Sequence, residues 1–260
     1  MTRAIAAAAA ALCACSSVNM FPSSKTGGGD DGHGGMTSVD GGATGDGGGI
    51  GSGLVSGRVC LMQDLRTPTT GCAGSTVAGL TVTLGASAAT TTANGGFTMA
   101  MPTGTNLVWT VSGTTTTPPV PIETTVMSFG ATGALIPAIA QGDYESLIDT
   151  NGATFDPASE GSIVASVTEQ GAPLSGEVGQ VTPAPLALLY DTASADNWSP
   201  DDTSTHGIVW ATGVTAGTAQ LSVVPHTQVG SGSGSGSGVA VASGIVVQAD
   251  AITFVQLDTP

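Results

Sequence analysis

Positive charge is scarce in this chain of 260 residues, which has 4 Lys and Arg against 19 Asp and Glu and a formal net charge of −15. A surface that binds nucleic-acid phosphates needs several Lys and Arg side chains gathered on one face. Lys25, Arg58 and Arg66 are instead scattered along the sequence. We therefore exclude nucleic-acid binding and attraction to an anionic membrane surface, and we interpret the negative charge as a source of solubility.

Aromatic residues are also few, at 4% of the chain, and apolar runs are short. The run at residues 5–12 is far below the ~20 apolar residues that a transmembrane helix needs. In contrast, 40 Gly, 14 Pro and abundant Thr and Val favour short β-strands joined by turns. These features predict aliphatic cores of modest size in an all-β protein.

The N-terminus predicts export. Arg3 precedes a short apolar run, and the segment Leu12-Cys13-Ala14-Cys15 resembles a bacterial lipobox, with Leu three residues before the modified cysteine. The resemblance implies a signal peptide at residues 1–14, cleavage before Cys15 and lipidation of Cys15. Ser16 implies outer-membrane sorting, on the periplasmic or the cell-surface face. An ordinary signal peptide with incidental cysteines is the alternative.

Residues 15–53 are rich in Gly, Ser and Asp and nearly free of bulky apolar side chains. Such a segment cannot bury enough apolar surface to offset the entropy lost on ordering. We therefore predict a disordered tether whose r.m.s. reach is about 35 Å for ~38 residues.

Residues 54–130 predict a first β-sandwich. The turn Asn94-Gly95-Gly96 predicts a hairpin between strands at residues 88–93 and 97–101. Phe97, Met99 and Met101 alternate along the second of these strands, so we expect all three in the core, together with Trp109. The other expected strands lie at residues 55–62, 80–84, 107–111 and 122–129.

Cys60 and Cys72 flank a polar loop at residues 61–71. In an exported protein we expect them to form a disulfide. Closing a loop of about 12 residues stabilises the fold by roughly 3 kcal/mol in the chain-entropy model. A metal site is the alternative, but two thiols without a nearby His lack the usual ligand set.

Four motifs of this first sandwich resemble a carboxypeptidase regulatory-like domain, whose pattern is G-x-V, G-x-x-V-x-L, T-x-x-x-G-x-F and P-x-G. The matching segments are Ser56-Gly57-Arg58-Val59, then residues 79–84, then residues 92–97, then Met101-Pro102-Thr103-Gly104. The match covers about 60 residues, and the loop at 61–71 replaces the family's usual short turn. The resemblance implies a prealbumin-like sandwich of seven strands that serves as an accessory module and carries no peptidase residues.

Residues 131–156 are predicted to connect two modules through a short helix. Asp143 is the expected cap, the helix runs to Thr150, and Asn151-Gly152 is the expected stop. The apolar side chains expected on its buried face are Tyr144, Leu147 and Ile148.

Residues 157–260 predict a second sandwich that repeats the first and resembles the same carboxypeptidase regulatory-like family, with the family's usual turn at residues 169–176. This gives an all-β protein of two tandem antiparallel sandwiches, prealbumin-like or Ig-like. Residues 160–167 repeat the opening strand, and residues 205–210 align with 94–99, which places Gly207-Ile208 on Gly96-Phe97. Residues 230–238 alternate Gly and Ser and predict a flexible loop. Further strands are expected at residues 186–190, 216–223, 239–247 and 252–257.

The candidate binding site is an acidic loop at residues 191–205, which contains Asp191, Asp196, Trp198, Asp201 and Asp202. Oxygen ligands at this density can hold calcium, but the spacing is not that of an EF-hand, and a solvated loop has the same composition. Trp198 either anchors a carbohydrate or protein partner or packs back on the sandwich.

No catalytic motif is present, because the sequence lacks a G-x-S-x-G elbow before a helix and an H-E-x-x-H segment. His206 and His226 are the candidate general bases, and both are expected at the surface. We assign no catalytic residue, no metal ligand and no cofactor, and we predict that the protein is not an enzyme.

Three functions fit these observations. The first is a lipid-anchored structural or adhesive scaffold of the cell envelope that binds protein or glycan through sandwich loops. The second is a calcium- or carbohydrate-binding lipoprotein that uses the acidic loop. The third is an accessory subunit of an envelope hydrolase. If function is local, we expect it in the loops that differ between the two copies, at residues 61–71 and 191–205.

Overall fold

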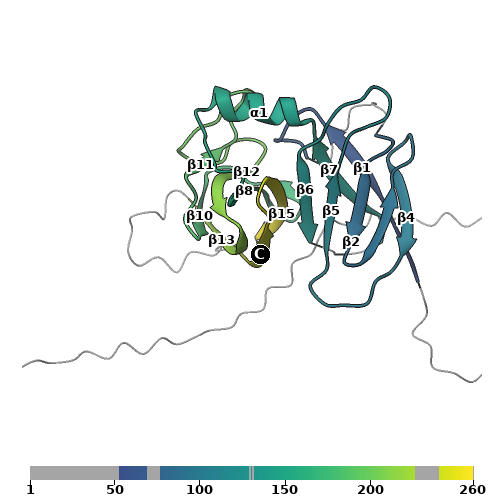
Figure 1. Cartoon of the computed structure of the whole chain (residues 1–260). Coiled ribbons are helices and arrows are strands. Elements are labelled where there is room, and N and C mark those ends of the chain that lie inside the picture. Colours follow the sequence, from purple (N-terminus) through teal and green to yellow (C-terminus); the bar gives the residue numbers. More distant parts are fainter. Residues whose placement is uncertain (1–52, 69–76, 129, 131, 226–239, 260) are drawn as a thin grey trace, which may run out of the picture.

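The computed structural model describes residues 53–68, 77–128, 130, 132–225 and 240–259, which form many strands and one helix (Figure 1). The predicted all-β class is confirmed. The predicted signal peptide, Cys15, the tether except for Gly53, Cys72, His226 and the loop at 230–238 lie outside the described residues. Within the described ranges, no helix is long and apolar enough to cross a membrane.

The first sandwich packs two layers of strands around one core. One layer is a three-stranded sheet of order β4-β1-β7, with β4 (Gly96–Ala100), β1 (Leu54–Met62) and β7 (Ala134–Ile139). The other layer has the order β6-β5-β2-β3, with β6 (Thr124–Ser128), β5 (Val108–Ser112), β2 (Thr81–Leu84) and β3 (Ser87–Thr90). The layers hold seven strands in total, as the family resemblance implies.

The large apolar side chains predicted for this core are in it, with one exception. Phe97, Met99 and Trp109 are buried, and the rings of Phe97 and Trp109 meet edge to face with centroids 5.2 Å apart. Met101 is 37% exposed, so its assignment to the core is wrong. It lies beyond the end of β4, where the alternation of inward and outward side chains no longer applies.

The strand β7 lies in the segment assigned from the sequence to the connector. It pairs in parallel with β1, with Ile136 opposite Val59. Four of its six residues are buried, which is typical of a strand covered on both faces. Pro137 fits there because β7 is an edge strand. The first sandwich therefore extends to Ile139.

The hairpin predicted at Asn94-Gly95-Gly96 is wrong. β3 pairs with β2, whereas β4 pairs with β1 in the opposite sheet, so the chain crosses between sheets at this turn. Gly95 has φ +80°, and its carbonyl accepts a hydrogen bond from the Val59 N–H at 2.9 Å. A Cβ at Gly95 would lie 2.3 Å from the Val59 carbonyl oxygen, so this close approach requires glycine.

The second sandwich has the same two-layer plan. One layer has the order β11-β12-β8-β15, with β11 (Ala187–Tyr190), β12 (Ile208–Thr215), β8 (Glu160–Glu169) and β15 (Ala251–Thr259), and the short β9 (Ala172–Pro173) pairs with β8. The other layer has the order β10-β13-β14, with β10 (Glu177–Thr182), β13 (Gly217–Pro225) and β14 (Ala240–Val247). The last two strands therefore lie in different sheets.

The order of strands supports the internal repeat. The sheet β4-β1-β7 corresponds to β12-β8-β15, and β2-β5-β6 corresponds to β10-β13-β14. In each copy a positive-φ glycine accepts the N–H of a valine in the opening strand, Gly95 from Val59 and Gly207 from Val167. Gly207 is thus equivalent to Gly95, and the sequence alignment with Gly96 is wrong by one residue.

A shared strand joins the two sandwiches, which lie side by side in Figure 1. β15 runs parallel to β8 over eight residue pairs and parallel to β6 over four, so both four-stranded layers become one nine-stranded sheet. The Thr253 hydroxyl donates to the Val246 carbonyl of β14 at 2.7 Å, so that side of β15 faces the three-stranded sheet. The neighbouring Ile252 and Phe254 point to the opposite side.

A third core lies at the joint, where Ile252 and Phe254 meet residues of both sandwiches and of helix α1 (Gln141–Thr150). Tyr144 is buried there, and Leu147 and Ile148 pack against the same core, as predicted from the sequence. The other fully or mostly buried members include Met62, Leu65, Ile139, Val164, Trp198, Ile208 and Trp210.

The helix ends as predicted but begins differently. Asn151 is the C-cap and Gly152 follows with φ +61°. The N-cap is Ala140, which makes no side-chain cap bond, so the assignment of Asp143 as the cap is wrong. Asp143 lies in the first turn, where a negative charge is favourable next to the helix dipole.

Candidate functional site

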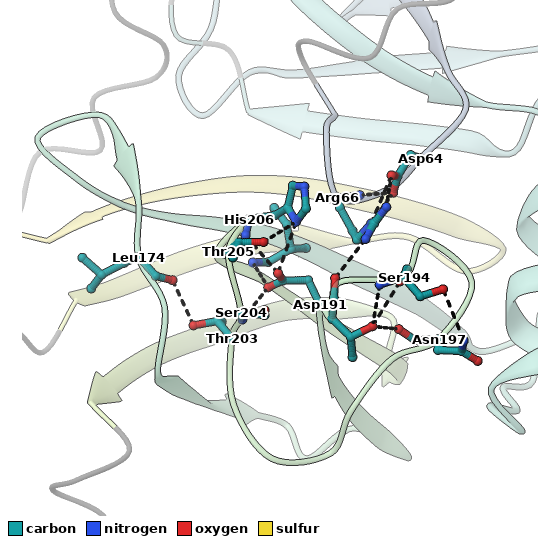
Figure 2. Close-up of polar contacts among 12 residues, drawn as sticks. Asp64, Arg66, Leu174, Asp191, Ser194, Asn197, Thr203, Ser204, Thr205 and His206 are labelled. Atoms are coloured by element: carbon teal, nitrogen blue, oxygen red, sulfur yellow. Dashed lines mark hydrogen bonds and ion pairs between the residues drawn. The ribbon is translucent and has the colours of Figure 1, made fainter.

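The acidic loop joins β11 to β12 and is organised around Asp191, which is 1% exposed. One carboxylate oxygen of Asp191 accepts the backbone N–H groups of Ser204 at 3.1 Å and Ile208 at 2.8 Å, and the other accepts that of His206 at 3.0 Å (Figure 2). Hydrogen bonds to an ionised acceptor are about twice as strong as neutral ones. Asp191 therefore fixes the far end of its own loop.

Thr203 holds the same loop to residues 174–177, which lead into β10. Its hydroxyl donates to the Leu174 carbonyl and accepts the Glu177 N–H, both at 2.9 Å. Its backbone N–H donates to the Glu177 carbonyl, and its carbonyl accepts the Gly176 N–H. Every polar group of Thr203 thus has a partner, so this part of the loop is a built structure rather than a solvated one.

The other three predicted carboxylates do not form a cluster with that of Asp191. Asp196 and Asp201 are exposed, Asp202 is half-buried, and Asp201 accepts a hydrogen bond from the Ser199 hydroxyl at 3.0 Å. Nowhere in the described residues do three or more His, Cys, Asp or Glu side chains form a group suited to a metal ion. The arrangement therefore gives the calcium hypothesis no support.

Trp198 is 9% exposed and packs back on the sandwich, which was the second of its two predicted positions. Its ring meets Trp210 of β12 at a centroid distance of 5.1 Å and an interplanar angle of 65°. Edge-to-face aromatic pairs stabilise by about 0.5–1.5 kcal/mol beyond the burial of their area. Trp198 is thus a core residue of the joint and does not offer a ring to a ligand.

The two loops that differ between the repeats meet at the joint. Arg66 of the loop at 61–71 donates from Nη1 to the carbonyl of Thr192 in the acidic loop at 2.9 Å. The same guanidinium forms a forked ion pair with Asp64, with contacts of 2.7 to 3.0 Å. Burial acts to raise the pKa of Asp64, but the hydrogen bonds and charge of Arg66 lower it below its usual value.

Asn151, at the end of α1, makes the second attachment of the acidic loop. Its amide donates to the Asp196 carbonyl at 3.1 Å, and its side-chain oxygen accepts the Trp198 N–H at 2.9 Å. Sequence reasoning identified Asn151 only as a helix stop and Arg66 only as a scattered cation. Neither long-range contact has a local sequence signal, because each joins residues far apart in the chain.

The geometry around His206 does not form a catalytic triad. The Thr205 hydroxyl lies 3.2 Å from Nδ1 of His206, and an Asp191 carboxylate oxygen lies 3.5 Å from the same nitrogen. A serine- or threonine-based triad places the nucleophile and the carboxylate on opposite ring nitrogens. His206 therefore cannot take the hydroxyl proton on one ring nitrogen while a carboxylate orients the ring from the other. His226, the other candidate base, lies outside the described residues.

Two open clefts border the joint. One, of about 420 Å³, lies beside the acidic loop and α1 and is lined in part by Asp64, Asp143 and Asp196. The other, of about 590 Å³, lies between the sandwiches and has no charged residue in its lining, which includes Leu107 and Val246. Neither brings together a nucleophile, a base and an oxyanion donor, which an acyl-transfer site requires.

No protein-family model and no curated protein matches the sequence. Among solved structures, the minor pilin GBS52 of Streptococcus agalactiae aligns at 11% identity and a TM-score of 0.24, over 80% of this chain and 97% of the pilin. The TIE protein of Bacillus anthracis aligns at 10% identity and a TM-score of 0.22, over 79% of this chain and 34% of the TIE chain. The shaft pilin SpaA of Lactobacillus rhamnosus GG aligns at 8% identity and a TM-score of 0.22, over 80% of this chain and 97% of the pilin.

Cys60 is buried, in agreement with a structural role. Its predicted partner Cys72 lies outside the described residues, so the disulfide stays a prediction. The same holds for lipidation of Cys15. The resemblance to a carboxypeptidase regulatory-like domain rests on its sequence motifs.

Proposed function

We propose that the protein is a non-enzymatic, lipid-anchored scaffold of the cell envelope in which two sandwiches act as one rigid unit. One observation carries the rigid unit: β15 belongs to the sheets of both sandwiches at once. The proposed anchor is supported by the segment Leu12-Cys13-Ala14-Cys15. The third core and the contact between the two irregular loops add to the same joint. A tandem array built in this way resists bending between its modules.

In this proposal, a binding partner does not contact the acidic loop or the loop at 61–71. The acidic loop and the loop at 61–71 are engaged with each other through Arg66 and Thr192, and Asp191 and Trp198 are buried. A protein or glycan partner would therefore contact other surfaces. The acyl chains on Cys15 and the tether at 15–53 would hold this unit at the outer membrane.

Rigidity is tested by equilibrium unfolding in denaturant, followed by tryptophan fluorescence and by far-UV circular dichroism. Trp109 lies in the first core, whereas Trp198 and Trp210 lie in the joint. If the sandwiches form one unit, both signals change in a single coincident transition. Two separated transitions would show independent modules and would refute the rigid scaffold.

Anchoring is tested by comparing two matched cysteine variants in a host that processes lipoproteins. Cys15→Ser is expected to abolish incorporation of labelled fatty acid and to move the protein from the membrane fraction to the soluble fraction. Cys13→Ser is expected to leave both unchanged, because Cys13 does not fit the lipobox frame. A Cys15→Ser protein that is still acylated and membrane-bound would contradict the proposed anchor.

Cross-linking from intact cells, followed by purification, identifies the partner, and recovery of a hydrolase would favour the accessory-subunit alternative.

A further inference from the structure

Glu123 is a buried carboxyl group at the joint that the proposed function does not use. It precedes β6, its backbone N–H donates to the Ile139 carbonyl at the end of β7, and its residue is 5% exposed. Among the described residues, its Oε1 atom is buried without a hydrogen-bond partner. Burying a carboxylate without a partner is costly, whereas a neutral carboxyl group is tolerated much better.

The charges that act on Glu123 come from two other elements of the joint. Asp250 lies in the turn between β14 and β15 of the second sandwich, and Glu145 lies on α1. Burial raises the pKa of the Glu123 carboxyl to about 7, and the negative charges of Asp250 and Glu145 add to this rise. The buried Tyr144 of α1 is the other nearby titratable group, and it donates to the Ser162 hydroxyl. β6 and β7 carry no titratable side chain.

We propose that Glu123 makes the contact between the two sandwiches sensitive to pH. When Glu123 is protonated, the first sandwich, α1 and the turn at Asp250 pack together around a neutral group. When Glu123 is ionised, its charge lies in a site that hydrates it poorly and is repelled by the charges of Asp250 and Glu145, so the contact loosens. Asp250 precedes Ala251, which pairs with Thr124, the residue after Glu123. The inference concerns the joint alone and holds whether or not Cys15 is lipidated.

The direction of the effect follows from proton linkage. An unperturbed Glu has a pKa of about 4.3, so between that value and about 7 the folded joint binds a proton that the opened joint releases. The closed joint is therefore favoured most below about pH 4.3, and this advantage declines as the pH rises above that value and is lost by about pH 7.

The test is amide hydrogen exchange of the full chain at pH 5.5 and pH 8.5, with rates corrected for intrinsic exchange. In the wild type, protection of the amides that pair β6 with β15 is expected to fall by at least about tenfold at the higher pH, since one pKa unit corresponds to a factor of ten. Glu123→Gln removes the titration and retains the shape, so its protection is expected to be equal at both values. Asp149→Asn, at an exposed position of α1, is the matched control and is expected to behave as wild type.

Two results would overturn the inference. One is an equal loss of protection in the wild type and in Glu123→Gln. The other comes from carboxyl ¹³C NMR of the wild type, which does not depend on any variant folding: a Glu123 titration midpoint near the ordinary value of about 4.3 would remove the basis of the proposal.

Discussion

Replacing Gly95 by alanine tests the close approach that defines both repeats. Gly95 has φ +80°, and a Cβ there would lie 2.3 Å from the Val59 carbonyl oxygen. Gly171 is the matched control, because it has φ +82° but a Cβ added to it would meet no atom within 4 Å. Both substitutions incur the left-handed backbone cost of about 1–2 kcal/mol. Only Gly95→Ala also forces β1 away from the turn.

The added cost at Gly95 follows from what must move. The hydrogen bond from the Val59 N–H to the Gly95 carbonyl, at 2.9 Å, is worth about 1 kcal/mol net. Displacing packed strands to fit an extra methyl group costs about 1–3 kcal/mol more. Gly95→Ala is therefore expected to lower the free energy of unfolding by about 3–6 kcal/mol, against about 1–2 kcal/mol for Gly171→Ala.

The assay is urea unfolding of the full chain, supported by the melting temperature, which shifts by about 2–4 °C per kcal/mol for a protein of this size. Gly207→Ala should resemble Gly95→Ala, because a Cβ at Gly207 would lie 2.5 Å from the Val167 carbonyl oxygen. If Gly95→Ala proves no more destabilising than Gly171→Ala, the steric argument is refuted. If Gly207→Ala proves far milder than Gly95→Ala, the equivalence of the two glycines is refuted.

Three further substitutions address the acidic loop. Asp191→Asn places an amide donor against the His206 N–H and should cost about 1.5–3 kcal/mol of unfolding free energy. The exposed Asp201→Asn should cost less than about 0.5 kcal/mol in the same urea assay, and equal effects would contradict the role given to Asp191. Trp198→Ala should cost about 3–5 kcal/mol and reduce the change in fluorescence on unfolding. A near-neutral result would mean that Trp198 does not pack on Trp210.

The sequence predicted most strands because alternation and β-branched runs are local signals. β1 and β8 were found almost to the residue, and Trp109 was correctly placed in a core. Which strands pair was harder to predict, because a Gly-rich turn has the same sequence pattern whether it closes a hairpin or crosses between sheets. At Gly95 the chain crosses between sheets, because β4 pairs with β1 whereas β3 pairs with β2. The local sequence of the turn does not contain this information.

The acidic loop shows that composition does not distinguish a binding loop from a structural one. Its aspartates suggested a surface that binds cations, yet Asp191 directs its oxygens to backbone N–H groups of its own loop. That role depends on the loop folding back on itself, which spacing does not encode. Arg66 and Asn151 likewise act across long stretches of sequence. The chain thus uses its irregular loops to join two modules, a role that no local pattern could have indicated.

The position of β15 at the end of the described chain has a consequence for how the protein is made. Until Ile252 emerges to pair with Thr125, β6 presents an unpaired strand edge, although its own sandwich was synthesised much earlier. Pairings between residues so distant in sequence form slowly, and open edges invite association with other chains. The sheet of the first sandwich is therefore completed only when the last strand of the second has been synthesised.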